Sequence, residues 1–160
     1  MAFHDDLLQQ AFLLVQKERK TPKQASLRRA VSTAYYALFH LLISEATANW
    51  NSAQLRTALG RAFDHSTMKS ASCRILNSRH SPFLGEDPAV LDKLKAVATT
   101  FARLQEQRHI ADYDNTTVWT RTDALKEVDD AEPASTTWKA IRHERIAQAY
   151  LVSLLVKHRG

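Results

Sequence analysis

The sequence predicts an all-α protein: an antiparallel, up-and-down bundle of four or five helices that takes up residues 1–160 as a single domain. Only three glycines and four prolines occur among the 160 residues. This is about a third of their share in average proteins, whereas a sheet protein with many tight turns needs more of both. Apolar residues also recur at helical spacing along most of the chain, as expected for helices with one buried face.

The first two helices are predicted over residues 4–20 and 23–48. In the first, apolar residues between Leu7 and Val15 form one face, and Pro22 ends the helix because the residue before a proline avoids the helical region. The second contains neither glycine nor proline and is apolar nearly all round over AYYALFHLLI. A helix without a polar face is usually buried, so we expect this one at the centre of the bundle.

A third helix is predicted over residues 52–76, with an apolar face that continues past Gly60. The glycine weakens this helix by up to about 1 kcal/mol relative to alanine. Cys73 lies on the same helix among apolar residues, and we interpret it as a small buried core residue. Residues 77–88 hold two prolines and Gly85 and are predicted to form a long loop.

A fourth helix is predicted over residues 88–109. Pro88 suits its first turn, and apolar residues recur every three or four positions along it. The polar residues 112–120 that follow are predicted to form a second loop.

The remaining chain is also predicted to be helical. Thr120 and Asp123 have the spacing of a capping box, which predicts a helix over residues 121–130. Pro133 is expected to kink or restart this helix. The last helical stretch is predicted to run to His158.

The cysteine content and the charge of the chain predict its compartment and its partners. A single cysteine cannot form an internal disulfide, which favours the reducing cytoplasm. The sequence has no apolar run of about 18 residues and no basic region at its start, so neither a membrane partner nor a signal peptide is expected. The net charge of +5 suits a nucleic-acid or phosphate partner, although a solvated basic surface explains it equally well.

Most of the net charge falls in residues 51–85, which hold five lysines and arginines and one acid. His65 and Lys69 lie one helical turn apart within this segment. They belong either to a surface that faces RNA or to a solvated helix face.

Four polar residues stand out within the apolar second helix. Arg29, Thr33, Tyr36 and His40 share one helical face. Burying such a row is costly unless each group finds a hydrogen-bond partner. The row is therefore either a structural hydrogen-bond network or part of a ligand site.

A dense polar string, RHIADYD, lies where the fourth helix is expected to end. It contains Arg108, His109, Asp112, Tyr113 and Asp114. Basic residues in a last helical turn interact favourably with the helix dipole, but loops held by rigid helices also often hold sites. The sequence has no histidine pair at metal-binding spacing and no glycine-rich phosphate loop, so no metal or cofactor is expected.

Together, RRAVSTAYYALFH in the second helix and RHIADYD at the end of the fourth resemble the HEPN family. HEPN domains are all-α bundles of about this length, so the resemblance covers essentially the whole chain. It implies a toxin or defence protein that cuts RNA without a metal, and a homodimer with the active cleft at its interface. It also implies an antitoxin that is a minimal nucleotidyltransferase, for which Tyr113 is a candidate target.

The ribonuclease motif of this family is an arginine, then four to six residues, then a histidine. Arg103 and His109 satisfy the spacing with five intervening residues. Arg108 aligns better with the arginine of the RxxADYD form, and the histidine position then falls on Tyr113 or an adjacent aspartate. The resemblance thus implies His109 as general acid or base and either Arg103 or Arg108 as the phosphate clamp.

The first functional hypothesis is a metal-independent endoribonuclease toxin. In it, RNA or a nucleotide contacts Arg29, Tyr36, His40, His65, Lys69, Asp112, Tyr113 and Asp114. The alternative is a non-catalytic nucleotide-binding or protein-interaction module of the same fold, partnered with a nucleotidyltransferase, and a third is an unrelated helical regulator. The first two differ in what they require of Arg108, because an arginine buried against Asp112 binds phosphate poorly.

Overall fold

The structure is a computed structural model that describes residues 1–77 and 86–157. Within these residues the chain forms helices and no strand, which confirms the all-α prediction. The described part holds seven helices rather than four or five. They are α1 (Phe3–Val15), α2 (Gln24–Thr47), α3 (Ala53–Gly60), α4 (His65–Asn77), α5 (Pro88–Tyr113), α6 (Arg121–Ile141) and α7 (Arg145–Ser153).

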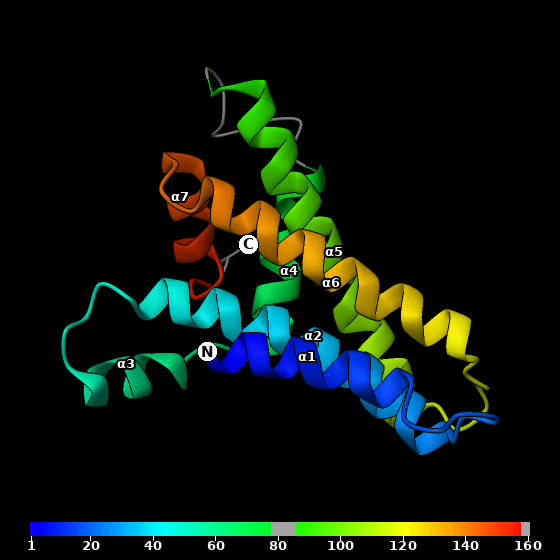
Figure 1. The fold of residues 1–160 in the computed structure, drawn as a ribbon. Coiled ribbons are helices and arrows are strands. Elements are labelled where there is room, and N and C mark those ends of the chain that lie inside the picture. The colour runs from blue at the N-terminus through cyan, green and yellow to red at the C-terminus, as the bar shows by residue number, and fades with distance from the viewer. Residues whose placement is uncertain (78–85, 158–160) are drawn as a thin grey trace.

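Helix α2 lies at the centre of the fold, as predicted. It packs against α1, α5 and α6 and also contacts α3 and α7. Figure 1 shows α1 lying along α2, whereas α3 lies at one end of this pair, away from α5 and α6. Tyr35 and Leu38 of α2 are buried, and the Tyr35 ring packs on Phe101 of α5. Burial of each large apolar side chain contributes about 1.5 to 3 kcal/mol.

Helix α1 ends five residues earlier than predicted, at Val15. The reason lies in the connection to α2. The carboxylate of Glu18 accepts hydrogen bonds from the Ser26 hydroxyl at 2.8 Å and from the Lys23 backbone N–H at 3.4 Å. Glu18 thus holds the connecting segment against the first turn of α2, and burial of Ser26 excludes solvent from part of this contact.

The single helix predicted over residues 52–76 is wrong, because the structure divides it into α3 and α4. Gly60 is the last residue of α3. Asp64 then accepts hydrogen bonds from the backbone N–H of Thr67 at 2.8 Å and from its hydroxyl at 2.7 Å, which stabilises a new helix start. Phe63, in the turn between the two helices, is buried.

Helix α5 begins at Pro88 as predicted but extends to Tyr113 rather than to residue 109. Asp87 caps its start by accepting a hydrogen bond from the backbone N–H of Ala89 at 2.9 Å. Most of the RHIADYD string therefore lies on a helix, and only Asp114 begins the following loop. The loop predicted over residues 77–88 lies mainly outside the described residues.

The capping box predicted for Thr120 and Asp123 is present and begins α6. This helix continues through Pro133, so of the two predicted effects of the proline the restart is wrong; the proline lies on the exposed side, where water can bind the unpaired carbonyl group. Instead, the chain breaks after Ile141 and starts again as α7. The predicted end of the last helix at His158 falls outside the described residues.

Two further observations concern the surface and the membrane. Cys73 is only partly buried, so its assignment as a buried core residue is wrong. Of the helices in the described residues, none combines the length and the apolar character needed to cross a lipid bilayer.

Candidate functional site

The buried Arg108 of α5 lies against two tyrosines of α2. Its side chain is about nine-tenths buried, and its Cζ lies 5.3 Å from the ring centroid of Tyr35 and 6.0 Å from that of Tyr36. At these distances the tyrosine rings attract the cation electrostatically. Helix packing thus draws the motif arginine inward, toward α2.

The charge of Arg108 is offset by Asp112, one helical turn further along α5. Nη1 of Arg108 lies 3.6 Å from Oδ2 of Asp112, and the Ser32 hydroxyl donates a hydrogen bond to the same oxygen at 3.3 Å. The buried Nε of Arg108 has no hydrogen-bond partner in the described part of the chain. The Arg108 and Asp112 side chains therefore form an ion pair rather than a close, two-pronged hydrogen-bonded pair.

His65, at the start of α4, completes this group of side chains. Its Nδ1 shares a hydrogen bond of 2.7 Å with the hydroxyl of Tyr35, and its ring lies 4.5 Å from that of Phe39. Burial lowers the pKa of His65, the nearby Arg108 lowers it further, and Asp64 opposes both effects. Burial raises the pKa of Tyr35 well above its ordinary value, so the phenol stays protonated.

Four of the residues predicted for the site thus come together from α2, α4 and α5. We call the whole set the arginine–tyrosine cluster: Ser32, Tyr35, Tyr36, His65, Arg108 and Asp112. Ser32 and Tyr35 were not predicted, because Tyr35 belongs to the apolar run of the second helix and Ser32 does not share the helical face of Arg29, Thr33, Tyr36 and His40. The cluster ties three helices together and leaves Tyr36 half-buried and Asp112 exposed at its edge.

Arg103, expected as a phosphate clamp, is bound to α6 instead. It forms ion pairs with Glu127 and with Asp130, the latter at 2.6 Å. Glu127 is itself buried, so this contact is an internal part of the α5–α6 packing. With two carboxylates on its guanidinium, Arg103 has little capacity left for a phosphate.

His109, expected as the general acid or base, lies apart from both arginines. It is exposed, and its ring packs on that of Tyr113 at 5.0 Å between centroids. Arg108, its neighbour in sequence, faces the core, since successive residues on a helix point about 100° apart. The expected cleft formed by an arginine and His109 is therefore not formed in the described part of the chain.

The loop after α5 is held by Arg28 and not by Arg29, which is exposed. Arg28 donates hydrogen bonds to the backbone oxygens of Ala111, Asp114 and Thr117 at 2.9, 2.8 and 2.6 Å. The Asp114 carboxylate accepts hydrogen bonds from the hydroxyl groups and a backbone N–H of the two threonines that follow, which lowers its pKa to about 2. Arg28 and Asp114 are thus structural residues of this turn.

Lys69 and His40 were also predicted to bind nucleic acid. Lys69 pairs with Glu106 of α5 at 2.8 Å, which offsets its charge. His40 packs edge-on against Phe3 at 4.9 Å between centroids and lines a groove on another side of α2. Burial lowers the pKa of His40, and the nearby His4 and His65 lower it further.

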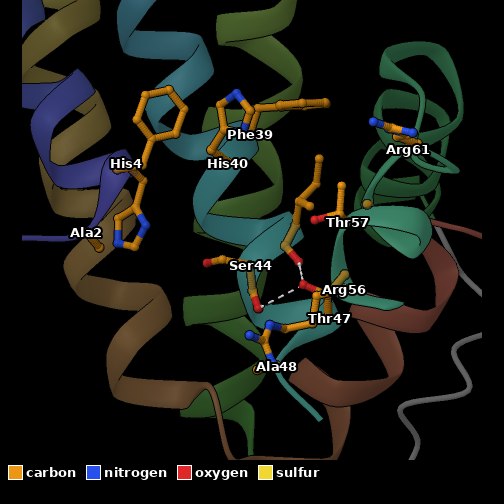
Figure 2. Close-up of a pocket in the computed structure, with 13 residues that line it drawn as sticks. Ala2, His4, Phe39, His40, Ser44, Thr47, Ala48, Arg56, Thr57 and Arg61 are labelled. Atoms are coloured by element: carbon orange, nitrogen blue, oxygen red, sulfur yellow. Dashed lines mark hydrogen bonds between the residues drawn. The ribbon is translucent and has the colours of Figure 1, made fainter. Parts of the chain in front are cut away.

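That groove has a volume of about 720 Å³ and lies between the start of α1, the second half of α2, and α3. Figure 2 shows His4 on the α1 side, His40 and Ser44 on α2, and Arg56 and Arg61 on the α3 side. We call it the α1–α3 groove. Its two arginines were predicted only as part of a basic segment, because helical spacing does not indicate which other helix they will lie near.

The last two findings concern a possible metal site and the comparison with known proteins. Within residues 1–77 and 86–157, histidine, cysteine, aspartate and glutamate side chains form no group of three that would hold a metal ion. No family model matches the chain, and neither the curated proteins nor the solved structures provide a match.

Proposed function

We propose that this protein is a HEPN-like helical module that acts by binding a protein partner and does not cut RNA. The partner in this proposal is a minimal nucleotidyltransferase of a toxin–antitoxin or defence pair, and the module is a cytoplasmic homodimer. The resemblance of RRAVSTAYYALFH and RHIADYD to the family supplies the partner. The ion pair of Arg108 with Asp112 is the reason why we do not propose RNA cleavage.

The ion pair between Arg108 and Asp112 is the observation that carries this proposal. RNA cleavage without a metal needs a base near the 2′-hydroxyl and an unpaired cation for the charged phosphorus centre. Arg108 is buried with a carboxylate in front of it, and Arg103 is paired with two carboxylates. A phosphate approaching either arginine would meet negative charge, and His109 is not beside them to act as the base.

The turn after α5 supports a protein partner. Tyr113 and Val118 flank it and are 66% and 75% exposed. Arg28 donates hydrogen bonds to two backbone oxygens between them, those of Asp114 and Thr117, and a third to Ala111 just before them. A rigid turn with exposed apolar side chains loses little conformational entropy on binding, which favours a protein interface.

The first experiment incubates the purified protein with mixed RNAs in EDTA, beside His109→Ala. We expect the wild type to leave the RNAs intact. Cleavage by the wild type that is lost in His109→Ala would show that the ribonuclease hypothesis is correct and this proposal wrong.

The second experiment measures binding to a minimal nucleotidyltransferase, the partner class proposed above, by calorimetry. Val118→Asp should weaken binding at least tenfold because it places a charge on the turn. Val152→Asp is the matched control, since Val152 is 64% exposed on α7 and should not matter. Equal affinities of both variants and the wild type would contradict the proposed surface.

A further inference from the structure

The α1–α3 groove is lined by basic and hydroxyl side chains and by no acidic one among the described residues. Its ionisable lining residues are His4, His40, Arg56 and Arg61. Three hydroxyl groups, those of Ser44, Thr47 and Thr57, complete its polar lining. The absence of a carboxylate distinguishes this groove from the arginine–tyrosine cluster, where Asp112 faces the arginine.

Arg61 carries the free charge of the groove. Its side chain is exposed and makes neither a hydrogen bond nor an ion pair within residues 1–77 and 86–157. Arg56 is anchored, since its Nη1 donates hydrogen bonds to the backbone oxygens of Trp50 and Asn51 at 2.6 and 2.9 Å. These are neutral acceptors, so Arg56 keeps its net positive charge while its position is fixed.

Two acids on the α1 and α2 sides of the groove, Asp5 and Glu45, are paired with cations. Asp5 lies 3.4 Å from the Nζ of Lys139 and 3.6 Å from the Nε2 of His4. Glu45 pairs with Arg142 at 3.5 Å. The positive charge at the α3 side of the groove is therefore offset less than that of Arg103 or Arg108.

Apolar side chains form the floor and one wall of the groove. Phe39 and Ile43 of α2 line it, and Phe3 of α1 contributes a ring that is 60% exposed. An exposed phenylalanine beside a groove gains free energy when a ligand covers it, at about 25 cal/mol for each Å² of apolar surface removed from water. The lining thus suits a ligand with an apolar body.

We propose that the α1–α3 groove binds a small organic anion with an apolar body, such as an aryl or branched-alkyl carboxylate. The anionic head lies against the unpaired Arg61, Arg56 adds positive charge at the other end of the α3 side, and the apolar body lies on Phe3 and Ile43. The volume of about 720 Å³ falls within the usual range of small-molecule sites, about 300 to 1,000 Å³. This inference rests on the groove alone and does not depend on the proposed protein partner.

The test uses two fluorescent probes that share a body and differ in charge. The first is 8-anilinonaphthalene-1-sulfonate, an aromatic anion, and the second is N-phenyl-1-naphthylamine, its neutral counterpart. We expect the folded wild-type protein to bind the anion at least fivefold more tightly than the neutral probe. Arg61→Gln should remove most of this preference, and Arg29→Gln, which changes an exposed arginine outside the groove, should leave it intact.

A second variant tests the apolar wall. Phe3→Ser should weaken the binding of both probes to a similar extent, because it removes apolar surface and no charge. Circular dichroism in the near ultraviolet establishes that each variant is folded, since partly folded proteins bind the anionic probe without a specific site.

Competition identifies the class of ligand. Displacement of the probe by benzoate or by 3-methylbutanoate, a branched-alkyl carboxylate, supports the proposal if Arg61→Gln also weakens the binding of both competitors. Displacement by nucleotides alone would overturn the assignment to carboxylates. The proposal also fails if the two probes bind equally well to the wild type, or if Arg61→Gln and Arg29→Gln bind the anion alike. None of these outcomes changes the RNA-cleavage result, so the two proposals fail separately.

Discussion

Nη1 of Arg108 lies 3.6 Å from Oδ2 of Asp112, one turn along α5, so the charge of the motif arginine is paired within the protein. The arginine is buried against the rings of Tyr35 and Tyr36, whereas the aspartate reaches the surface. An arginine in this position acts first on the stability of the fold. We therefore expect substitutions of Arg108 to change the free energy of unfolding.

Arg108→Ala should destabilise the protein by about 3 kcal/mol, because it removes a buried side chain and leaves Asp112 without its cation. Arg108→Met keeps the volume against the tyrosines and should cost about 1 kcal/mol. Urea unfolding followed by circular dichroism measures both values. A smaller loss for the alanine variant than for the methionine variant would show that packing around Arg108 is not what stabilises this region.

Because Arg103 and Glu127 form an ion pair, we expect substitutions of the two residues to have non-additive effects on the free energy of unfolding. Arg103→Met leaves the buried carboxylate of Glu127 without its partner and should cost about 3 kcal/mol. Adding Glu127→Gln removes that unpaired charge, so the double variant should be more stable than Arg103→Met alone. A double-mutant cycle from urea unfolding gives the coupling, and additive effects would contradict an internal pair.

We expect substitution of Arg28 to have a local effect on the loop after α5. Arg28→Ala removes all three hydrogen bonds to the backbone oxygens of this segment. We expect faster amide hydrogen exchange in residues 114–120 and unchanged exchange at the centre of α2. Arg29→Ala is the matched control, because that neighbouring side chain is exposed, and an equal effect of both variants would contradict the assignment.

Because three histidines are partly buried, we expect the stability of the protein to depend on pH. Burial lowers the pKa of His4, His40 and His65 below the value in the unfolded chain, about 6.5. The unfolded chain then binds more protons than the folded one, so stability is fully present above about pH 6.5 and falls as the pH drops below it. The groups facing these imidazoles include Asp5, Glu45, Asp64, Arg108, Lys139 and Arg142.

Unfolding by urea at pH 7.5, 6.5 and 5.5 measures this dependence. His65→Gln, which retains a polar side chain next to Tyr35, should reduce the slope between pH 6.5 and 5.5. His143→Gln is the control, since His143 is exposed on the connection between α6 and α7. A slope that is the same in all three proteins would mean that His65 does not contribute.

The fold class and several helix boundaries were predictable from the sequence because their causes are local. Pro88 and the capping box of Thr120 and Asp123 begin helices within a few residues of themselves, and the structure has both. The break at Asp64 has an equally local cause, a carboxylate that caps α4. It was missed because the apolar spacing continues across the turn and hides it.

The candidate site was predicted less well. Arg28 and Arg29 are neighbours in sequence, yet only Arg28 faces the loop after α5. The same applies to Arg108 and His109, of which one is buried and the other exposed. Helical spacing identifies which residues share a face, but it does not indicate which face another helix will cover.

By itself, the sequence determined that this protein is helical, that its second helix is central, and where most of the helices start. Only the tertiary structure decided which charges are paired. Arg103 meets Glu127 and Asp130 because α5 packs on α6, and the unpaired Arg61 lines the α1–α3 groove because α3 lies beside α2. The physical reason is range: capping and apolar spacing act over a few residues, whereas the ion pairs of Arg103 join side chains of two helices that only helix packing brings together.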